Sequence, residues 1–217
     1  MYRSLVFLFC GVVGGPGGGG ILAVPKADVG TASSWALDFK FHDPQRITLR
    51  FPGDAHLTTF WYMVYEVTNH TGEDRGFYPS FHLVTDTLQV VEGGADVNPS
   101  VYDAIAARHK DEFPFLAPPP KVTGLLLQGE ENARASVAVF RMFDSKANGF
   151  TVYVSGLSGE IRRIRNPGFD PSRKESESNL RFFVLRRTLA ITYDLPGDPN
   201  TQSRAVPIRR TRTWVMR

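Results

Sequence analysis

Side chains that could act as acids, bases or cation ligands lie close together in one short stretch, VTNHTGEDRGFYPSF, at residues 67–81. His70 is followed by the carboxylates of Glu73 and Asp74, and such groups can transfer protons or bind a metal. Acid–base catalysis requires such groups to be held within hydrogen-bond distance of the reacting atoms by closely packed neighbours. The stretch is instead rich in turn-forming residues, Gly72 among them. We predict a hairpin connection with its charged side chains in water.

A second candidate lies at the end of a predicted helix. Residues 98–113, NPSVYDAIAARHKDEF, begin with Asn98 and Pro99, which suit the N-cap and the first helical position. His109 and Glu112 are three residues apart, a spacing that permits two metal ligands on one helical face. No second histidine has a suitable spacing, so a charged helix end is predicted in place of a metal site.

Two looser pairs, His42 with Asp43 and His82 with Asp86, complete the set of candidate acids and bases. The nucleophile motifs G-x-S-x-G and S-x-x-K are absent. The glycine-rich residues 14–20 lack the Lys-Ser/Thr of a phosphate-binding loop. We therefore predict a protein that is not an enzyme and that uses no metal and no cofactor.

The sequence IRRTRTW near the C-terminal end combines arginines with an aromatic residue. On a strand, Arg210, Arg212 and Trp214 would share one face, with Arg209 on the other. Arginines beside an aromatic ring can hold phosphate, sulfate or carboxylate groups, which makes these four residues the candidate ligand-binding set. The alternative is that the charges prevent an edge strand from pairing with another chain.

The charge distribution also favours an anionic partner. Residues 160–217 hold 13 Lys and Arg against 6 Asp and Glu, a net charge of +7, whereas residues 1–159 carry −4. A basic region of this kind attracts polyanions, although solvated strand faces would give the same count. Nucleic acid is not expected as a partner, because the whole chain carries only +3 and has no recognisable nucleic-acid-binding motif.

The N-terminal segment has the order of a secretory signal. Arg3 precedes an apolar run at residues 5–13, and small and flexible residues follow. The run is too short to span a bilayer by itself. We predict a signal peptide and glycine-rich segment at 1–32 and a location in the periplasm or outside the cell. Cleavage is expected after Ala27 or after Ala32, and the small residues Gly30 and Ala32 favour the second position. An uncleaved membrane anchor is the alternative. The only cysteine, Cys10, lies in this signal, so the mature chain would form no disulfide.

The body of the chain, residues 33–217, reads as one all-β domain. Residues 35–41, WALDFKF, alternate apolar and polar side chains as a half-buried strand does. Residues 58–69, TTFWYMVYEVTN, are apolar on both faces, which is typical of a central strand covered on both sides. Short strands with frequent turns predict an antiparallel, immunoglobulin-like β-sandwich with one short inserted helix near 99–112. A closed β-barrel is the alternative fold.

Two segments resemble bacterial extracytoplasmic domains of immunoglobulin-like fold, an uncharacterised family of unknown function. They are YEVTNHTGEDRGFYPSFHLVTD and LLLQGEENARASVAVFRMFDSKANGFTVYVSGL. The resemblance implies the fold and assigns no catalytic residue. The inserted helix and the arginine-rich C-terminal strand depart from the family's plain pattern.

These observations predict an exported structural or protein-interaction module of the cell envelope, with envelope proteins as partners. The alternative is a binding module for an anionic glycan or polymer that uses the arginine-rich C-terminal strand. Neither the identity of the partner nor the oligomeric state follows from the sequence.

Overall fold

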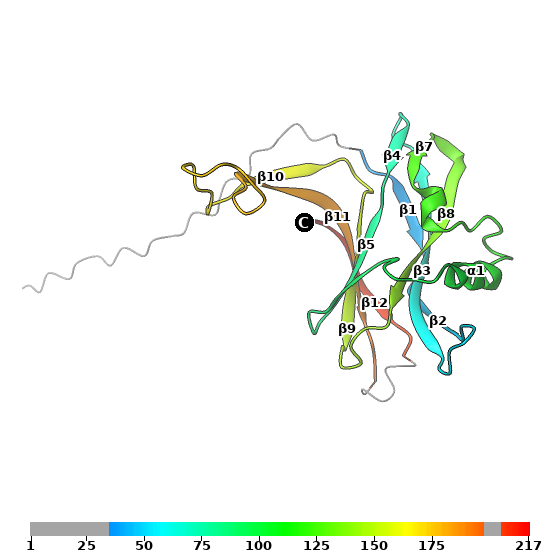
Figure 1. The fold of residues 1–217 in the computed structure, drawn as a ribbon. Coiled ribbons are helices and arrows are strands. Elements are labelled where there is room, and N and C mark those ends of the chain that lie inside the picture. Colours follow the sequence, from blue (N-terminus) through cyan, green and yellow to red (C-terminus); the bar gives the residue numbers. More distant parts are fainter. Residues whose placement is uncertain (1–34, 198–204) are drawn as a thin grey trace, which may run out of the picture.

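The computed structural model describes residues 35–197 and 205–217. The predicted signal at residues 1–32, with its cleavage position and Cys10, lies outside the described residues. The described chain is an all-β protein whose strands are paired antiparallel in two large sheets and one small sheet (Figure 1). No helix in this part of the chain is both long and apolar enough to cross a membrane.

The first sheet has four strands and is built around a long central strand. β3 pairs with β1 and β2 along one edge and with β8 along the other. Its strands are β1 (Asp38–Phe41), β2 (Gln45–Leu49), β3 (Thr58–Asn69) and β8 (Gly129–Arg141).

The second sheet has six strands, and its longest strand, β11, has partners on both edges. β10 and β9 pair with successive parts of one edge, and β12 pairs with the other. β5 and β6 extend the sheet beyond β9. The strands are β5 (Ser80–Thr85), β6 (Val90–Glu92), β9 (Gly149–Ser155), β10 (Ile161–Arg165), β11 (Phe182–Asp194) and β12 (Ile208–Met216).

Alternation along the strands places one large core between the two sheets. Trp61, Met63 and Tyr65 of β3 point into it from the first sheet, and Val152 and Ile191 do so from the second. All five are almost completely buried. The third sheet pairs β4 (Arg75–Phe77) with β7 (Gly124–Leu126) at one end of this core, where Phe77 and Leu126 are buried.

The other face of β3 packs against a helix, as the two-sided apolar pattern predicts. α1 (Pro99–Arg108) lies on the side of the first sheet that is turned away from the second sheet (Figure 1). Its buried Val101 and Ile105 contact the cluster that contains Tyr62 and Val64 of β3. Asn98 caps the helix by accepting a hydrogen bond from the backbone N–H of Ser100 at 3.0 Å, so the predicted start of the helix is confirmed.

Three predictions about the fold need correction. Both large sheets remain open in the described residues, so the closed barrel is wrong. A second helix, α2 (Pro119–Val122), follows the one helix predicted near 99–112, because prolines fit the first turn of a helix. Residues 67–81 form a turn but not a hairpin, since β4 pairs with β7 and the chain then enters the second sheet as β5.

Candidate functional site

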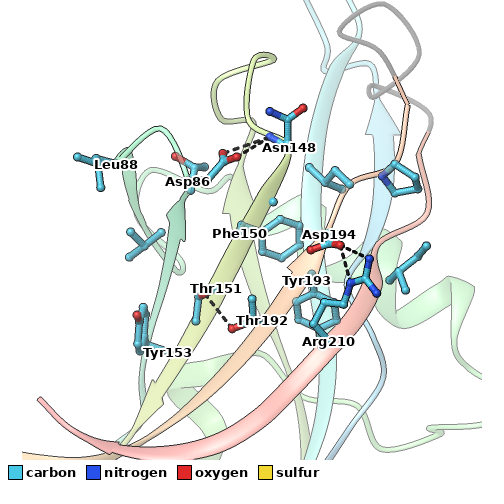
Figure 2. A pocket seen from close by; sticks show the side chains of 16 residues that line it. Asp86, Leu88, Asn148, Phe150, Thr151, Tyr153, Thr192, Tyr193, Asp194 and Arg210 are labelled. Carbon is cyan, nitrogen blue, oxygen red and sulfur yellow. Dashed lines mark hydrogen bonds and ion pairs between the residues drawn. The ribbon is translucent and has the colours of Figure 1, made fainter.

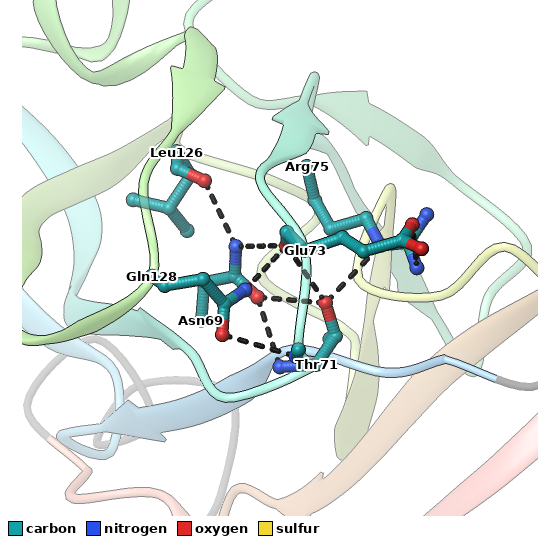
Figure 3. Close-up of polar contacts among 7 residues, drawn as sticks. Asn69, Thr71, Glu73, Arg75, Leu126 and Gln128 are labelled. Carbon is teal, nitrogen blue, oxygen red and sulfur yellow. Dashed lines mark hydrogen bonds and ion pairs between the residues drawn. The ribbon is translucent and has the colours of Figure 1, made fainter.

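The turn after β3 is organised by one buried amide. Asn69 is fully buried, and its Nδ2 donates to the carbonyl oxygens of Glu73 and Leu126, both at 2.9 Å. Its Oδ1 accepts from the backbone N–H and the hydroxyl of Thr71 (Figure 3). The side-chain amide of Gln128 donates a hydrogen bond to the Glu73 carbonyl and accepts one from the backbone N–H of Gly72. Because these bonds satisfy the backbone of the turn, its polar residues have a structural role.

The acids and bases of this turn do not converge on a common point. His70 Nδ1 lies 2.6 Å from the carboxylate of Asp38 on β1. Glu73 pairs with Arg75 at 2.9 Å, while Asp74 accepts a hydrogen bond from the backbone N–H of Gln128. The three ionisable side chains of the turn, His70, Glu73 and Asp74, are therefore directed to three separate partners.

His109 has a histidine neighbour, His42, with the two ring centres 6.4 Å apart. His42 is distant in sequence, so ligand spacing along the helix does not reveal it. Glu112 lies between His42 and His109, with nitrogen–oxygen distances of 3.3 and 4.0 Å. Burial lowers the pKa of His109, the carboxylate of Glu112 opposes this effect, and the positive charges of His42 and Arg108 add to it. Within the described residues, no group of three or more His, Cys, Asp or Glu side chains is arranged to hold a metal ion.

In the two remaining candidate pairs, His42 with Asp43 and His82 with Asp86, each member contacts a different partner. Asp43 accepts a hydrogen bond from the hydroxyl of Tyr193 at 3.0 Å, while the neighbouring His42 faces Glu112. His82 contacts the hydroxyl of Ser80 at 3.3 Å. Asp86 accepts from the backbone N–H of Asn148.

The arginines of β12 are divided between two faces of the sheet. Arg209 and Arg212 both lie over the ring of Phe41, at 5.3 and 5.6 Å from its centre. Arg210 points to the opposite side and pairs with Asp194 of β11 (Figure 2). Simple alternation predicted Arg210 on the same face as Arg212, but it is Arg209 that shares this face, so the prediction is wrong for both residues.

A β-bulge causes this division. Thr192 pairs with Thr211 but the next residue, Tyr193, pairs with Arg209, so Arg210 is an extra residue in β12. A bulge changes which side the following side chains face. Alternation read from sequence cannot include such an insertion.

Each predicted ligand-binding side chain already has a partner within the protein. Arg209 lies 3.4 Å from Asp43, and Arg212 donates to the carbonyl oxygen of Phe39 at 3.1 Å. Trp214 packs against the large core, and the guanidinium of Arg187 lies 4.7 Å from its ring centre. These contacts attach the edge of the second sheet to β1 of the first sheet.

The sequence interpretation missed a strongly basic pair of strands. β10 pairs with residues 182–186 of β11, and these two strands with the adjacent Arg187 form a ribbon that projects beyond the rest of the second sheet (Figure 1). We call it the basic ribbon, because it has five arginines and no acidic residue. Four of them are exposed and form no side-chain hydrogen bond or ion pair with any described residue: Arg162, Arg163, Arg165 and Arg186. The sequence signal is the segment IRRIR opposite FFVLRR.

An open groove of about 710 Å³ lies on the second sheet. The hydroxyls of Thr151 and Thr192 meet in it at 3.2 Å, on neighbouring strands (Figure 2). Asp86 lies on one side of the groove, and the Asp194–Arg210 pair lies on the other.

The groove and part of the basic ribbon belong to one face of the sheet. Odd-numbered β11 residues such as Ile191 enter the core, so the even-numbered residues face outward. Thr192 of the groove and Arg186 of the ribbon are therefore on the same side, which we call the outer face. Cross-strand pairing adds Arg163 and Arg165, which lie opposite Val184 and Phe182.

Comparison with protein-family models, with curated proteins and with solved structures finds no match to this chain.

Proposed function

We propose that this protein is an exported, non-enzymatic binding module whose basic ribbon holds anionic polymers through their phosphate, sulfate or carboxylate groups. The observation that carries the proposal is the contrast between two sets of arginines. Those of β12 are engaged inside the protein, whereas Arg162, Arg163, Arg165 and Arg186 have no anionic partner among the described residues.

The spacing of these side chains suits a polymer better than a single small anion. Arg163 and Arg165 are two residues apart on one strand, about 7 Å along its axis. Arg186 lies opposite Ile161, two positions before Arg163, so it is a diagonal neighbour at roughly 7–8 Å. A row of separated guanidinium groups can contact several charges of one chain, and each contact releases counterions.

Export and the fold family form part of the same proposal. The N-terminal order of charge, apolar run and small residues supports a signal peptide, with an uncleaved anchor as the alternative. An immunoglobulin-like β-sandwich is supported by the core shared between two antiparallel sheets. The two segments that resemble bacterial extracytoplasmic domains contribute strands to both sheets.

The test is binding of inorganic polyphosphate as a function of salt. Replacing Arg163 and Arg165 with Glu should weaken binding at least about tenfold, and should reduce the slope of log K against log salt by about 1.5. The matched control replaces Arg50 and Arg141, exposed arginines associated with the first sheet, with Glu. It changes the net charge equally and should have a much smaller effect. Equal losses in the two variants would contradict the proposal.

A protein-interaction role in the envelope is the second candidate. Phe183 and Val184 of the ribbon are 44% and 49% exposed, so the ribbon also presents apolar surface. A protein partner held by these side chains should remain bound at high salt, because apolar contacts are not screened. Replacing both residues with Ser should then release the partner without changing the affinity for polyphosphate.

A further inference from the structure

From the outer face we infer that the anionic polymer is a polysaccharide, with its acidic groups on the basic ribbon and its uncharged sugar units in the groove. This inference rests on the proposed function and narrows its ligand class. Polyphosphates and polysaccharides both offer anionic groups to arginine, but sugars also offer hydroxyl groups along the chain.

The groove has the chemistry to bind hydroxyl groups. Thr151 and Thr192 each offer a hydroxyl that can donate one hydrogen bond and accept two, so their mutual contact at 3.2 Å leaves capacity for a ligand. Asp86 and Asp194 add carboxylate oxygens, which are strong acceptors for hydroxyl donors.

The same groups make the groove unsuitable for the charged parts of the polymer. Asp86 and Asp194 contribute two negative charges, and Arg210 offsets only one of them. A phosphate or carboxylate placed here would meet a net negative charge, whereas a neutral sugar unit would not. The acidic groups are therefore directed to the ribbon and the neutral units to the groove.

The rim of the groove supplies apolar surface for the C–H groups of a sugar ring. Leu88 is 83% exposed on one side, and Ile208 is 48% exposed on the other. Leu88 has a φ of 66°, which is unusual for a bulky side chain. The hydroxyl of Thr85 fixes the turn by accepting from the N–H of Gln89 at 3.0 Å.

Arginine and aromatic side chains lie between the two ends of this surface. The guanidinium of Arg217 lies 4.2 Å from the ring centre of Tyr153, which also lines the groove. The backbone of Arg217 is hydrogen-bonded to that of Arg186 in the ribbon, at 2.7 and 3.1 Å. From Phe182 to Asp194, β11 extends about 40 Å at its usual rise per residue. One extended polymer can therefore contact ribbon and groove together.

The experiment compares two probes that differ in their neutral parts. Hyaluronan alternates an acidic sugar with an uncharged one, whereas inorganic polyphosphate has no sugar. The groove variant replaces Thr151 and Thr192 with Val, which keeps the branched shape and removes both members of one hydrogen bond, so that neither is left unpaired. The ribbon variant replaces Arg163 and Arg165 with Glu. Binding is measured by calorimetry on the full chain, with the thermal midpoint as a check of folding.

The groove variant should lose about tenfold in affinity for hyaluronan, from two lost hydrogen bonds, and none for polyphosphate. The ribbon variant should lose affinity for both probes. If the ribbon variant weakens both but the groove variant weakens neither or both equally, the polysaccharide inference is overturned and the proposed function stands. If the unsubstituted protein binds polyphosphate but not hyaluronan, the polysaccharide inference is likewise overturned and the proposed function stands. If the ribbon variant weakens neither, the proposed function fails and the inference fails with it.

Discussion

His109 Nε2 lies 3.0 Å from the hydroxyl of Tyr62, and this contact joins the end of α1 to the face of β3 that the helix covers. The same hydroxyl donates to Gln45 at 3.0 Å and accepts from Arg108 at 3.2 Å. The imidazole is thus held beside a guanidinium, with Glu112 and His42 on its other side.

This arrangement predicts that acid weakens the fold through His109. Because burial lowers the pKa of His109 in the folded state, the unfolded chain takes up a proton first as pH falls below about 6.5. The free energy of unfolding should therefore decrease below that pH. Urea unfolding at pH about 7.5 and about 5.5 should show a smaller decrease for His109→Gln than for the unsubstituted protein. An equal decrease in both proteins would contradict this assignment.

The buried amide of Asn69 should be essential for stability. Asn69→Asp removes the two hydrogen bonds that Nδ2 donates and brings a negative charge close to two carbonyl oxygens. We expect the free energy of unfolding to fall by about 3 kcal/mol or more. Asn98→Asp is the matched control, since the Asn98 side chain acts as an acceptor at its helix cap. It should change stability by less than about 0.5 kcal/mol. Similar losses at both positions would refute the explanation.

Leu88 should combine a cost in stability with a benefit in binding. Its positive φ is unfavourable for leucine and easier for asparagine, and its side chain buries little surface. Leu88→Asn should therefore raise the free energy of unfolding by about 0.5–1 kcal/mol and weaken hyaluronan binding. Leu57→Asn, at a residue that is 60% exposed, should do neither. A stabilised Leu88 variant with undiminished binding would remove the rim from the proposed site.

Two glycines with similar backbone angles should differ strongly in their tolerance of alanine. Gly53 and Gly156 have φ values of +89° and +85°, but only Gly156 lacks room for a Cβ atom, which would collide with the backbone of Tyr78. Gly53→Ala should cost about 1 kcal/mol from conformation alone. Gly156→Ala should cost at least about 2 kcal/mol more because of the collision. Chemical denaturation of both variants measures the difference, and equal costs would show that the connection near Tyr78 relaxes easily.

The sequence was informative where local patterns decide the structure. The two apolar faces of β3 predicted a central strand, and Asn98 with Pro99 predicted the start of α1. The turn residues around Asn69 predicted a turn, although its hydrogen-bond partner at Leu126 is 57 residues away.

The candidate site could not be derived in the same way, because it depends on pairing between distant segments. β10 becomes a strand by pairing with residues 182–186, and IRRIR alone has no clear alternation of apolar and polar residues. The bulge at Arg210 depends on how β12 pairs with β11. For this reason the sequence assigned ligand binding to arginines that have internal partners, and missed Arg163 and Arg165.

The two apolar faces of β3 also have a consequence for how uniquely the chain folds. In a strand with one polar face, a slip of one residue exposes apolar side chains, and this cost prevents the error. In β3, a slip of one residue would place Trp61 and Met63 on the face where Tyr62 and Val64 now lie. Both faces would remain apolar, so the slip would cost little hydrophobic burial. The correct alignment must therefore depend on the few polar groups of β3 whose hydrogen-bond partners lie at fixed positions. The hydroxyl of Tyr62, near the middle of the strand, and the amide of Asn69, at its last residue, distinguish the native pairing from its neighbours.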